Sequence, residues 1–304
     1  RELIAQQRPD VVTLDIEMPR MDGISFLKKL MQHCPIPVVI VSSLSRRGSR
    51  LAKEAMQAGA VSIVHKPSAA YSIEGVAEEL LLKVKAAARS RVETVRPALD
   101  PVDKALAQTT SKVVLIGAST GGTRALETVL SKLPPDAPGI VIVQHMPEHF
   151  TKSFADRLNE VCSIKVSEAT AGRSVLPGTA LIAPGNRHLV LCRSGARYYV
   201  DIRDTERVNL HRPSVDVLFR SGAECAGANA VGVIMTGMGK DGAAGLRDLR
   251  NAGAHTIAQD EQSCVVFGMP KEAINLGAAC EILPLDELAD GIMHAVVPDR
   301  LCEV

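Results

Sequence analysis

The sequence KVVLIGASTGG, from Lys112 to Gly122, decides how the larger part of this chain folds. The apolar, mostly β-branched residues after Lys112 predict a buried strand, and the glycines predict a tight turn into a helix over about 123–133. Ser119 lies in this turn. Glycines let a bound molecule come close to the backbone, and the unpaired N–H groups that begin a helix attract negative charge. The stretch therefore predicts a substrate-binding turn at the end of a parallel strand.

Two more apolar strands follow the same pattern. One covers 139–145 and ends in His145, and the other covers 230–237 and leads into the loop that holds Asp241. Parallel strands place their carboxyl ends at one edge of a sheet, so we expect Ser119, His145 and Asp241 to lie together. A serine hydroxyl becomes an effective nucleophile when an imidazole accepts its proton and a carboxylate orients that imidazole. The three residues therefore predict a site for serine acyl transfer.

Simpler roles for each of these residues remain open. Ser119, Thr120 and Asp241 all stand where a helix N-cap would stand, and His145 could be a hydrogen-bonded histidine at a sheet edge. Caps alone do not explain why a histidine ends the neighbouring strand. The pattern G-x-S-x-G at 117–121 is typical of α/β-hydrolases, but their catalytic residues run in the order Ser, acid, His. The order Ser, His, Asp differs, so we expect a doubly wound fold other than theirs.

The length and composition fit a globular protein with two domains. The chain has 304 residues, and its apolar residues, 46% of the total, form no run of membrane-spanning length. A net charge of +1, 3% aromatic residues and the lack of a basic tail argue against nucleic-acid binding. Seven cysteines without a C-x-x-C pair suit small buried side chains in a reducing compartment. We therefore expect a cytoplasmic protein with no membrane insertion.

Residues 1–83 predict a first α/β domain. Three apolar runs separated by helical segments predict parallel strands, and these strands end near Asp15, Ser42 and Lys66. A single polar residue at a strand end is ordinary, but these three share the sheet edge at which ligands bind in open α/β sheets. We therefore expect them to form one site.

A linker and a second domain follow. The segment 84–111 has two prolines, mixed charges and no sustained periodicity, which predicts a linker before a domain over 112–304. Within that domain, the short apolar runs of 179–201 are broken at 184–186 and again at 193–195. This pattern predicts antiparallel hairpins inserted in, or added to the edge of, a parallel sheet. The expected fold is a doubly wound, mostly parallel α/β domain with an antiparallel hairpin addition.

The first domain resembles the flavodoxin-like receiver domain of bacterial response regulators, through Asp15 followed by IEMPRMDG, Ser42 at the next strand end and Lys66 followed by proline. The resemblance implies that Asp15 accepts a phosphoryl group, Ser42 hydrogen-bonds to it and Lys66 pairs with its charge. It also implies a sensor histidine kinase as phosphodonor and Mg²⁺ as cofactor for phosphorylation in the intact protein. The first strand of receivers and its acidic pair have no match here, so Asp15 supplies only a partial Mg²⁺ site. We expect an N-terminally truncated receiver.

The second domain looks like the catalytic domain of the bacterial chemotaxis receptor methylesterases, over 112–297. The matching motifs are GASTGG at 117–122, QHMPEHFT at 144–151, HRPSVDVLF at 211–219 and TGMGKDGAAG at 236–245. The resemblance implies Ser119 as nucleophile, His145 as general base and acid, and Asp241 as the residue that orients His145. It implies the Met238 N–H as an oxyanion donor, and Thr120 as a second residue of the oxyanion loops.

The implied reaction is hydrolysis of glutamate methyl esters on methyl-accepting chemoreceptors, with release of methanol. Many relatives also deamidate receptor glutamines, and the esterase chemistry implies no cofactor and no metal. The resemblance further implies that the receiver covers the active site until phosphorylation loosens the interface.

Several marked residues fit more than one role. His211, Arg212 and Asp216 belong to the HRPSVD motif, which could act in the site or simply position a loop. His188 and His149 fit either a structural role or a role in the site.

Three other functions stay open. GASTGG could be a dinucleotide-binding loop, but such a loop predicts an acid at the end of the second strand, where His145 stands. An unchanged melting temperature with NAD or NADP would dismiss that function. The second is a response-regulated esterase for small molecules, and the third is a paralogous receptor methylesterase of a sensory system outside chemotaxis.

Overall fold

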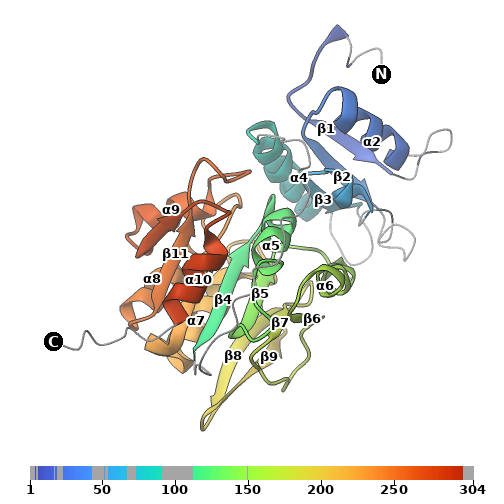
Figure 1. Ribbon diagram of the computed structural model, residues 1–304. Coiled ribbons are helices and arrows are strands. Elements are labelled where there is room, and N and C mark those ends of the chain that lie inside the picture. Colours follow the sequence, from blue (N-terminus) through green and yellow to red (C-terminus); the bar gives the residue numbers. More distant parts are fainter. Residues whose placement is uncertain are drawn as a thin grey trace. The chain divides into compact units, whose positions relative to one another are not determined.

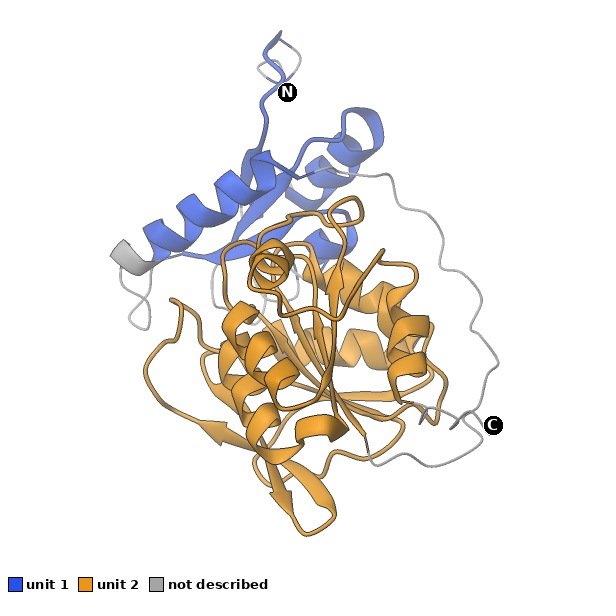
Figure 2. Cartoon of the chain, turned by 90° about the vertical axis from the view of Figure 1, so that its left-hand side faces the viewer, with its two compact units in different colours: residues 1–97 blue, residues 98–304 orange. Residues whose placement is uncertain are grey.

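A computed structural model describes residues 4, 6–16, 18, 23–42, 51, 54–66, 73–90, 112–148 and 150–296. The chain forms two compact units, residues 1–97 and 98–304 (Figure 2). His149, most of the motif that follows Asp15 and most of the segment 84–111 lie outside the described residues. None of the helices within the described ranges is long and apolar enough to cross a membrane.

Unit 1 contains a parallel sheet with its three described strands in the order β1-β2-β3 (Figure 1). Its elements are β1 (Val12–Asp15), α2 (Gly23–His33), β2 (Val38–Ser42), β3 (Ser62–His65) and α4 (Ile73–Ala88). Asp15 pairs with Val41 and Ser42 pairs with His65, so the carboxyl ends of the strands meet at one edge of the sheet. The predicted parallel α/β arrangement is confirmed. Helix α4 ends at Ala88, so the first residues of the segment 84–111, for which we predicted a linker, are helical.

Unit 2 is built around a seven-stranded sheet in the order β12-β11-β10-β4-β5-β7-β6. All neighbouring strands are parallel. The strands are β4 (Val113–Ala118), β5 (Gly139–Gln144), β6 (Lys165–Glu168), β7 (Thr179–Ile182), β10 (Ala230–Ile234), β11 (His255–Gln259) and β12 (Glu281–Leu283). The strand predicted from KVVLIGASTGG is thus the fourth of seven, with the strands before His145 and Asp241 on either side of it.

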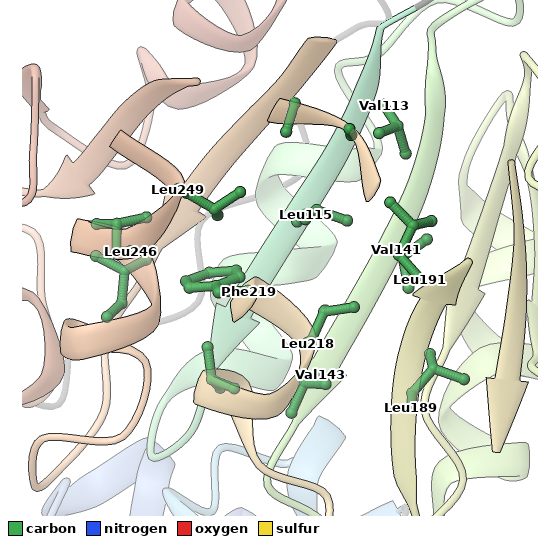
Figure 3. Close-up of a cluster of buried hydrophobic side chains, with 14 of the residues drawn as sticks. Val113, Leu115, Val141, Val143, Leu189, Leu191, Leu218, Phe219, Leu246 and Leu249 are labelled. Atoms are coloured by element: carbon green, nitrogen blue, oxygen red, sulfur yellow. The ribbon is translucent and has the colours of Figure 1, made fainter. Parts of the chain in front are cut away.

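Helices cover both faces of this sheet. They are α5 (Gly122–Leu130), α6 (Phe150–Val161), α7 (Val215–Cys225), the short 3₁₀ helix η1 (Gly227–Asn229), α8 (Ala243–Asn251), α9 (Met269–Asn275) and α10 (Leu288–Val296). Successive residues of a strand point to opposite faces, and the two cores follow this alternation. Leu115 packs with α7, α8 and β8 (His188–Ser194), as Figure 3 shows, whereas Ile116 packs with α5, α6 and α10. The doubly wound fold is therefore confirmed.

The prediction for 179–201 was partly wrong. Strand β7 pairs in parallel with β5 and β6 inside the main sheet, and only β8 and β9 (Arg197–Arg203) form an antiparallel hairpin, as a separate two-stranded sheet. Strands β6 and β7 can pair in parallel because the segment 169–178 between them runs past the hairpin and back. Within this segment, Val175 N–H donates to Tyr198 O of β9 (2.9 Å). The predicted antiparallel addition itself is confirmed.

Candidate active site

Ser119 lies where β4 turns into α5. Its N–H donates to Thr236 O (3.0 Å), and its carbonyl accepts from Gln144 Nε2 (2.9 Å) and from Gly122 N–H (2.8 Å). Gly121 adopts a positive φ of 80°, a left-handed conformation that glycine reaches without strain. These bonds fix the backbone of the turn, while the Ser119 side-chain oxygen makes no hydrogen bond with any described residue.

His145 follows β5 directly beside this turn. Its N–H donates to Ala118 O (3.1 Å), so the residue before Ser119 and the catalytic candidate His145 are hydrogen-bonded neighbours. The His145 ring is nearly buried, and its Nε2 lies 2.7 Å from Asp241 Oδ2. The other ring nitrogen, Nδ1, is also buried and has no hydrogen-bond partner among the described residues.

Asp241 precedes α8 and is fully buried as a side chain. Besides His145, four groups donate to its carboxylate: Val215 N–H (2.7 Å), Ser214 Oγ–H (2.7 Å), Asn209 Nδ2 (2.8 Å) and Asp216 N–H (3.3 Å). Burial by itself raises the pKa of Asp241, but the hydrogen bond and charge of His145, with the bonds from Asn209 and Ser214, outweigh burial and lower this pKa. Asp241 is therefore ionised at neutral pH.

An ionised Asp241 sets the tautomer of His145. The carboxylate can only accept, so Nε2 carries the proton and Nδ1 keeps the lone pair. Nδ1 is then the atom that can take a proton from a nucleophile. The structure brings His145 and Asp241 into contact and places Ser119 at the neighbouring strand end, without a hydrogen bond between Ser119 and His145. Such bonds often tighten only when a substrate binds.

His211 stacks on the His145 ring, with ring centroids 3.8 Å apart and planes inclined by 7°. The donor atoms of His145, His211 and Asp241 lie within 4.8 Å of one another, as they would around a metal ion. However, stacked rings direct their in-plane lone pairs into separate parallel planes, and Nε2 of His145 already binds Asp241. The stack suits a ring that is held flat against its neighbour better than a pair of metal ligands.

Two backbone donors are free near Ser119. In the described part of the chain, the N–H groups of Met238 and Thr120 donate to no acceptor. Their loops are joined because Thr236 Oγ1–H donates to Thr120 O (2.9 Å), and a Cβ added to Gly237 would lie only 2.8 Å from Ser119 Cβ. The arrangement suits stabilisation of an oxyanion that forms at a carbonyl attacked by Ser119.

The sequence did not single out Asn209 or Ser214, and it left the role of Asp216 open. Asp216 accepts from the N–H groups of Gly242 (3.1 Å) and Gly245 (2.7 Å) at the start of α8, and its other oxygen accepts from Asn209 Nδ2 (2.8 Å). It thereby holds the start of α8, and Asn209 links it to Asp241. The only sequence signal was the HRPSVD motif that contains Ser214 and Asp216.

Two other marked residues fix the loop before α7. His188 Nδ1 accepts from Ser214 N–H (3.2 Å), and its Nε2 donates to Glu206 O (2.9 Å). Arg212 Nη2 donates to Asn186 Oδ1 (2.9 Å) and Nη1 donates to Thr205 O (2.9 Å). Both residues therefore position the loop rather than contact Ser119, His145 or Asp241. His149 lies outside the described residues.

A cysteine near the site does not compete with Ser119 as nucleophile. Burial, with a smaller effect of the Asp260 charge, raises the pKa of Cys264 to about 12, against the effect of its hydrogen bond with Thr236. The thiol therefore stays protonated at neutral pH and is a weak nucleophile.

In unit 1, Lys66 Nζ lies 2.5 Å from Asp15 Oδ2, and Lys66 N–H donates to Ser42 O (2.9 Å). The Ser42 side chain is buried, and Asp15 is about one-third exposed. The three residues thus lie at one sheet edge. Within the described residues, no group of three His, Cys, Asp or Glu side chains gathers there.

Two family models match this chain. Residues 114–292 match the CheB methylesterase family, and residues 1–77 match the response regulator receiver domain. The chain is 55% identical over 302 residues to protein-glutamate methylesterase/protein-glutamine glutaminase 2 of Syntrophus aciditrophicus, covering 97% of this chain and 88% of that protein. It is 58% identical over 299 residues to protein-glutamate methylesterase/protein-glutamine glutaminase 4 of Anaeromyxobacter dehalogenans, covering 97% and 84%.

A solved structure is similar to the second unit. The crystal structure of the Thermotoga maritima CheB methylesterase catalytic domain matches 60% of this chain and 97% of its own chain, with 41% identity and a TM-score of 0.59.

Proposed function

Because this chain belongs to the CheB methylesterase family and carries a response regulator receiver domain, we propose that it demethylates glutamate side chains of chemoreceptors. It is a protein-glutamate methylesterase with protein-glutamine glutaminase activity, as its relatives over 97% of its length are named. Methylated glutamates of receptors are the proposed ester substrates, and receptor glutamines are the proposed amide substrates. A response regulator that acts on chemoreceptors serves adaptation in chemotaxis.

The observation that carries this proposal is the state of His145. Its Nε2 is bound to Asp241 at 2.7 Å, while Nδ1 is buried and without a partner among the described residues, at the strand end beside Ser119. A base that is oriented on one side and vacant on the other is what activation of a serine hydroxyl needs.

In the first half of the proposed reaction, Ser119 Oγ attacks the ester carbonyl and its proton moves to His145 Nδ1. The Met238 and Thr120 N–H groups stabilise the oxyanion, because neither has an acceptor among the described residues that it must release first. The tetrahedral intermediate collapses, the proton passes from Nδ1 to the methoxide, and methanol leaves an acyl-Ser119. With a glutamine substrate, ammonia leaves instead.

In the second half, water attacks the acyl-Ser119 carbonyl. His145 Nδ1 takes a proton from this water and returns it to Ser119 Oγ, so the products are free enzyme and a receptor glutamate. Asp241 remains ionised throughout and stabilises the charged imidazolium that exists in each half.

We place regulation at Asp15. Its carboxylate is about one-third exposed and paired with Lys66, which suits a phosphoryl acceptor whose new charge Lys66 would meet. The proposed phosphodonor is a sensor histidine kinase, and the proposed location is the cytoplasm. Mg²⁺ is the expected cofactor for receiver phosphorylation, and Asp15 would be one of its carboxylate ligands; we assign no step to the ion.

The substrate class can be tested by comparing two substrates with the same purified full chain. We expect methanol release from methylated receptor membranes at a kcat/KM far above that for a small soluble methyl ester. The control is membranes whose receptors were never methylated, which should release none. Turnover of the small ester with none on methylated receptor would favour a small-molecule esterase instead.

A further inference from the structure

The turn that precedes His211 has an unusual backbone. Val208 and His211 form an isolated antiparallel bridge with two hydrogen bonds, Val208 N–H to His211 O (3.1 Å) and His211 N–H to Val208 O (2.9 Å). Both residues between them have positive φ, 53° for Asn209 and 68° for Leu210. Two-residue turns of this kind prefer asparagine followed by glycine. Leu210 therefore occupies a position at which glycine is favoured.

Folding does not explain a leucine here. A left-handed conformation disfavours any L-residue with a Cβ, and leucine has no short polar group to offset the cost by a local hydrogen bond. Packing does not offset it either, because 64% of the Leu210 surface is exposed, the largest fraction among the exposed large apolar residues of the described chain. Glycine at this position would adopt the left-handed conformation with less strain than leucine, and it would expose less apolar surface to water.

The position of the turn gives the side chain a use. Asn209 on one side donates to Asp241 Oδ1 (2.8 Å), and His211 on the other side stacks on His145 at 3.8 Å. Leu210 therefore lies between one residue that contacts Asp241 and one that contacts His145, and its apolar side chain is exposed at the rim of the site.

The base of this turn is rigid. Asn209 Nδ2 also donates to Asp216 Oδ2 (2.8 Å), and Arg207 Nη1 donates to the carbonyl of Leu210 (3.4 Å). His188 holds the same loop through Glu206 O (2.9 Å). A fixed backbone need not be ordered when a partner binds, so only the rotamers of the Leu210 side chain are restricted and the remaining burial contributes to affinity.

We propose that Leu210 is a specificity-determining residue that packs on the receptor helix beside the reacting glutamate. This assignment rests on the proposed function and explains how the same site would select its substrate. On a helix, side chains three or four positions from the ester lie next to it on the same face. Leu210 contacts an apolar side chain one turn away from the ester, a contact that a small soluble ester cannot make.

Two variants separate this role from a structural one. Leu210→Gly removes the side chain and relieves the backbone, whereas Leu210→Ala removes most of the side chain and keeps the disfavoured conformation. Leu176→Ala is the matched control, because Leu176 is an exposed leucine (53%) of the same unit that lies in the connection between β6 and β7.

The experiment measures kcat/KM of the wild-type chain, residues 1–304, and of the three variants on methylated receptor membranes and on a small methyl ester, with the melting temperature of each. We expect both Leu210 variants to lose about tenfold in kcat/KM on receptor, mostly through KM, as for loss of a leucine side chain from an interface. Small-ester turnover should stay at the wild-type value, and Leu210→Gly should melt no lower than wild type. Leu176→Ala should match wild type in every assay.

Unchanged receptor turnover in Leu210→Gly and Leu210→Ala would overturn the assignment while leaving the proposed function intact. Equal losses on receptor and small ester would also overturn it, because Leu210 would then support the catalytic pair rather than the substrate. Absence of receptor turnover in the wild type, with the small ester still hydrolysed, would overturn the proposed function and this assignment together.

Discussion

The Asp241 carboxylate lies in the interior of unit 2, yet it is surrounded by groups that donate to it. Val215, Ser214, Asn209 and His145 supply four hydrogen bonds of 2.7–2.8 Å. An isolated buried carboxylate would become neutral, because burial disfavours the charged form. Here the donors reverse that preference, and the charge that remains is what fixes the tautomer of His145.

The Asp241→Asn variant should therefore lose activity with little change in fold. An asparagine keeps the shape but can present an N–H to His145 Nε2, which favours the opposite tautomer and removes the lone pair from Nδ1. We expect kcat on methylated receptor to fall by about 10⁴, as in other serine triads. Asp248→Asn, on the exposed surface of α8, is the control and should keep wild-type kcat. A loss below tenfold in Asp241→Asn would contradict the proposed role of this residue.

The same carboxylate predicts a pH dependence of stability. Its pKa in the folded chain lies below the usual value of about 3.9 for aspartate in unfolded chains, so the folded state binds fewer protons in acid. The stabilisation is fully present above about pH 4 and is lost as the pH falls toward the folded pKa. We expect the difference in unfolding free energy between wild type and Asp241→Asn, measured in denaturant, to be constant near neutral pH and to shrink below about pH 4. A difference that stays constant in acid would show that ionisation of Asp241 does not stabilise the fold.

At the scale of elements, the loop from β10 to α8 and the turn from β4 to α5 work as one unit. Gly237 joins them, because a Cβ there would lie 2.8 Å from Ser119 Cβ and would also meet the Met269 sulfur. A Gly237→Ala substitution must push the Met238 loop away from Ser119. We expect kcat to fall by about 10²–10³, the effect of losing one oxyanion donor.

A matched glycine provides the control for this substitution. Gly195 has a positive φ of 60° and nothing within 4 Å of an added Cβ, so Gly195→Ala introduces backbone strain without a clash. We expect it to lower the melting temperature and to leave kcat unchanged. Wild-type kcat in a folded Gly237→Ala variant would remove Met238 from the proposed oxyanion site.

The elements that the sequence predicted are those with strong local patterns. The apolar run after Lys112 predicted β4, the apolar run before the Asp241 loop predicted β10, and the convergence of three strand ends followed from parallel pairing alone. Strands β11 and β12 were missed, because HTIAQ mixes polar with apolar residues and β12 has only three residues, mostly exposed.

The rest of the site could not be predicted because it depends on contacts distant in sequence. Asn209 meets Asp241 across 32 positions, and Ser214 meets it across 27. Neither residue stands in a strand end or a glycine-rich loop, so no local pattern marks it. The stacking of His211 on His145 likewise joins two residues that are distant in sequence. The catalytic roles of Ser119, His145 and Asp241 stay predictions until the variants are measured.

At the scale of the whole molecule, regulation by the receiver predicts a difference between the full chain and its second unit. We expect residues 112–304 to turn over methylated receptor faster than the full chain, because the receiver would no longer restrict access to Ser119. The comparison requires a folded fragment. Its circular dichroism spectrum should show the helices and strands of unit 2, and it should melt in one cooperative transition. If a folded fragment turned over receptor no faster than the full chain, receiver inhibition would be the wrong account.

Methanol release by the Ser119→Ala variant tests the central claim most directly. Wild type and variant, each as residues 1–304, would be compared on the same methylated receptor membranes, with Ser131→Ala, at the end of α5, as the matched serine control. We predict that release disappears in Ser119→Ala and persists in wild type and Ser131→Ala. Release by a folded Ser119→Ala chain at a rate near that of the wild type would contradict the claim and would move the chemistry to another residue.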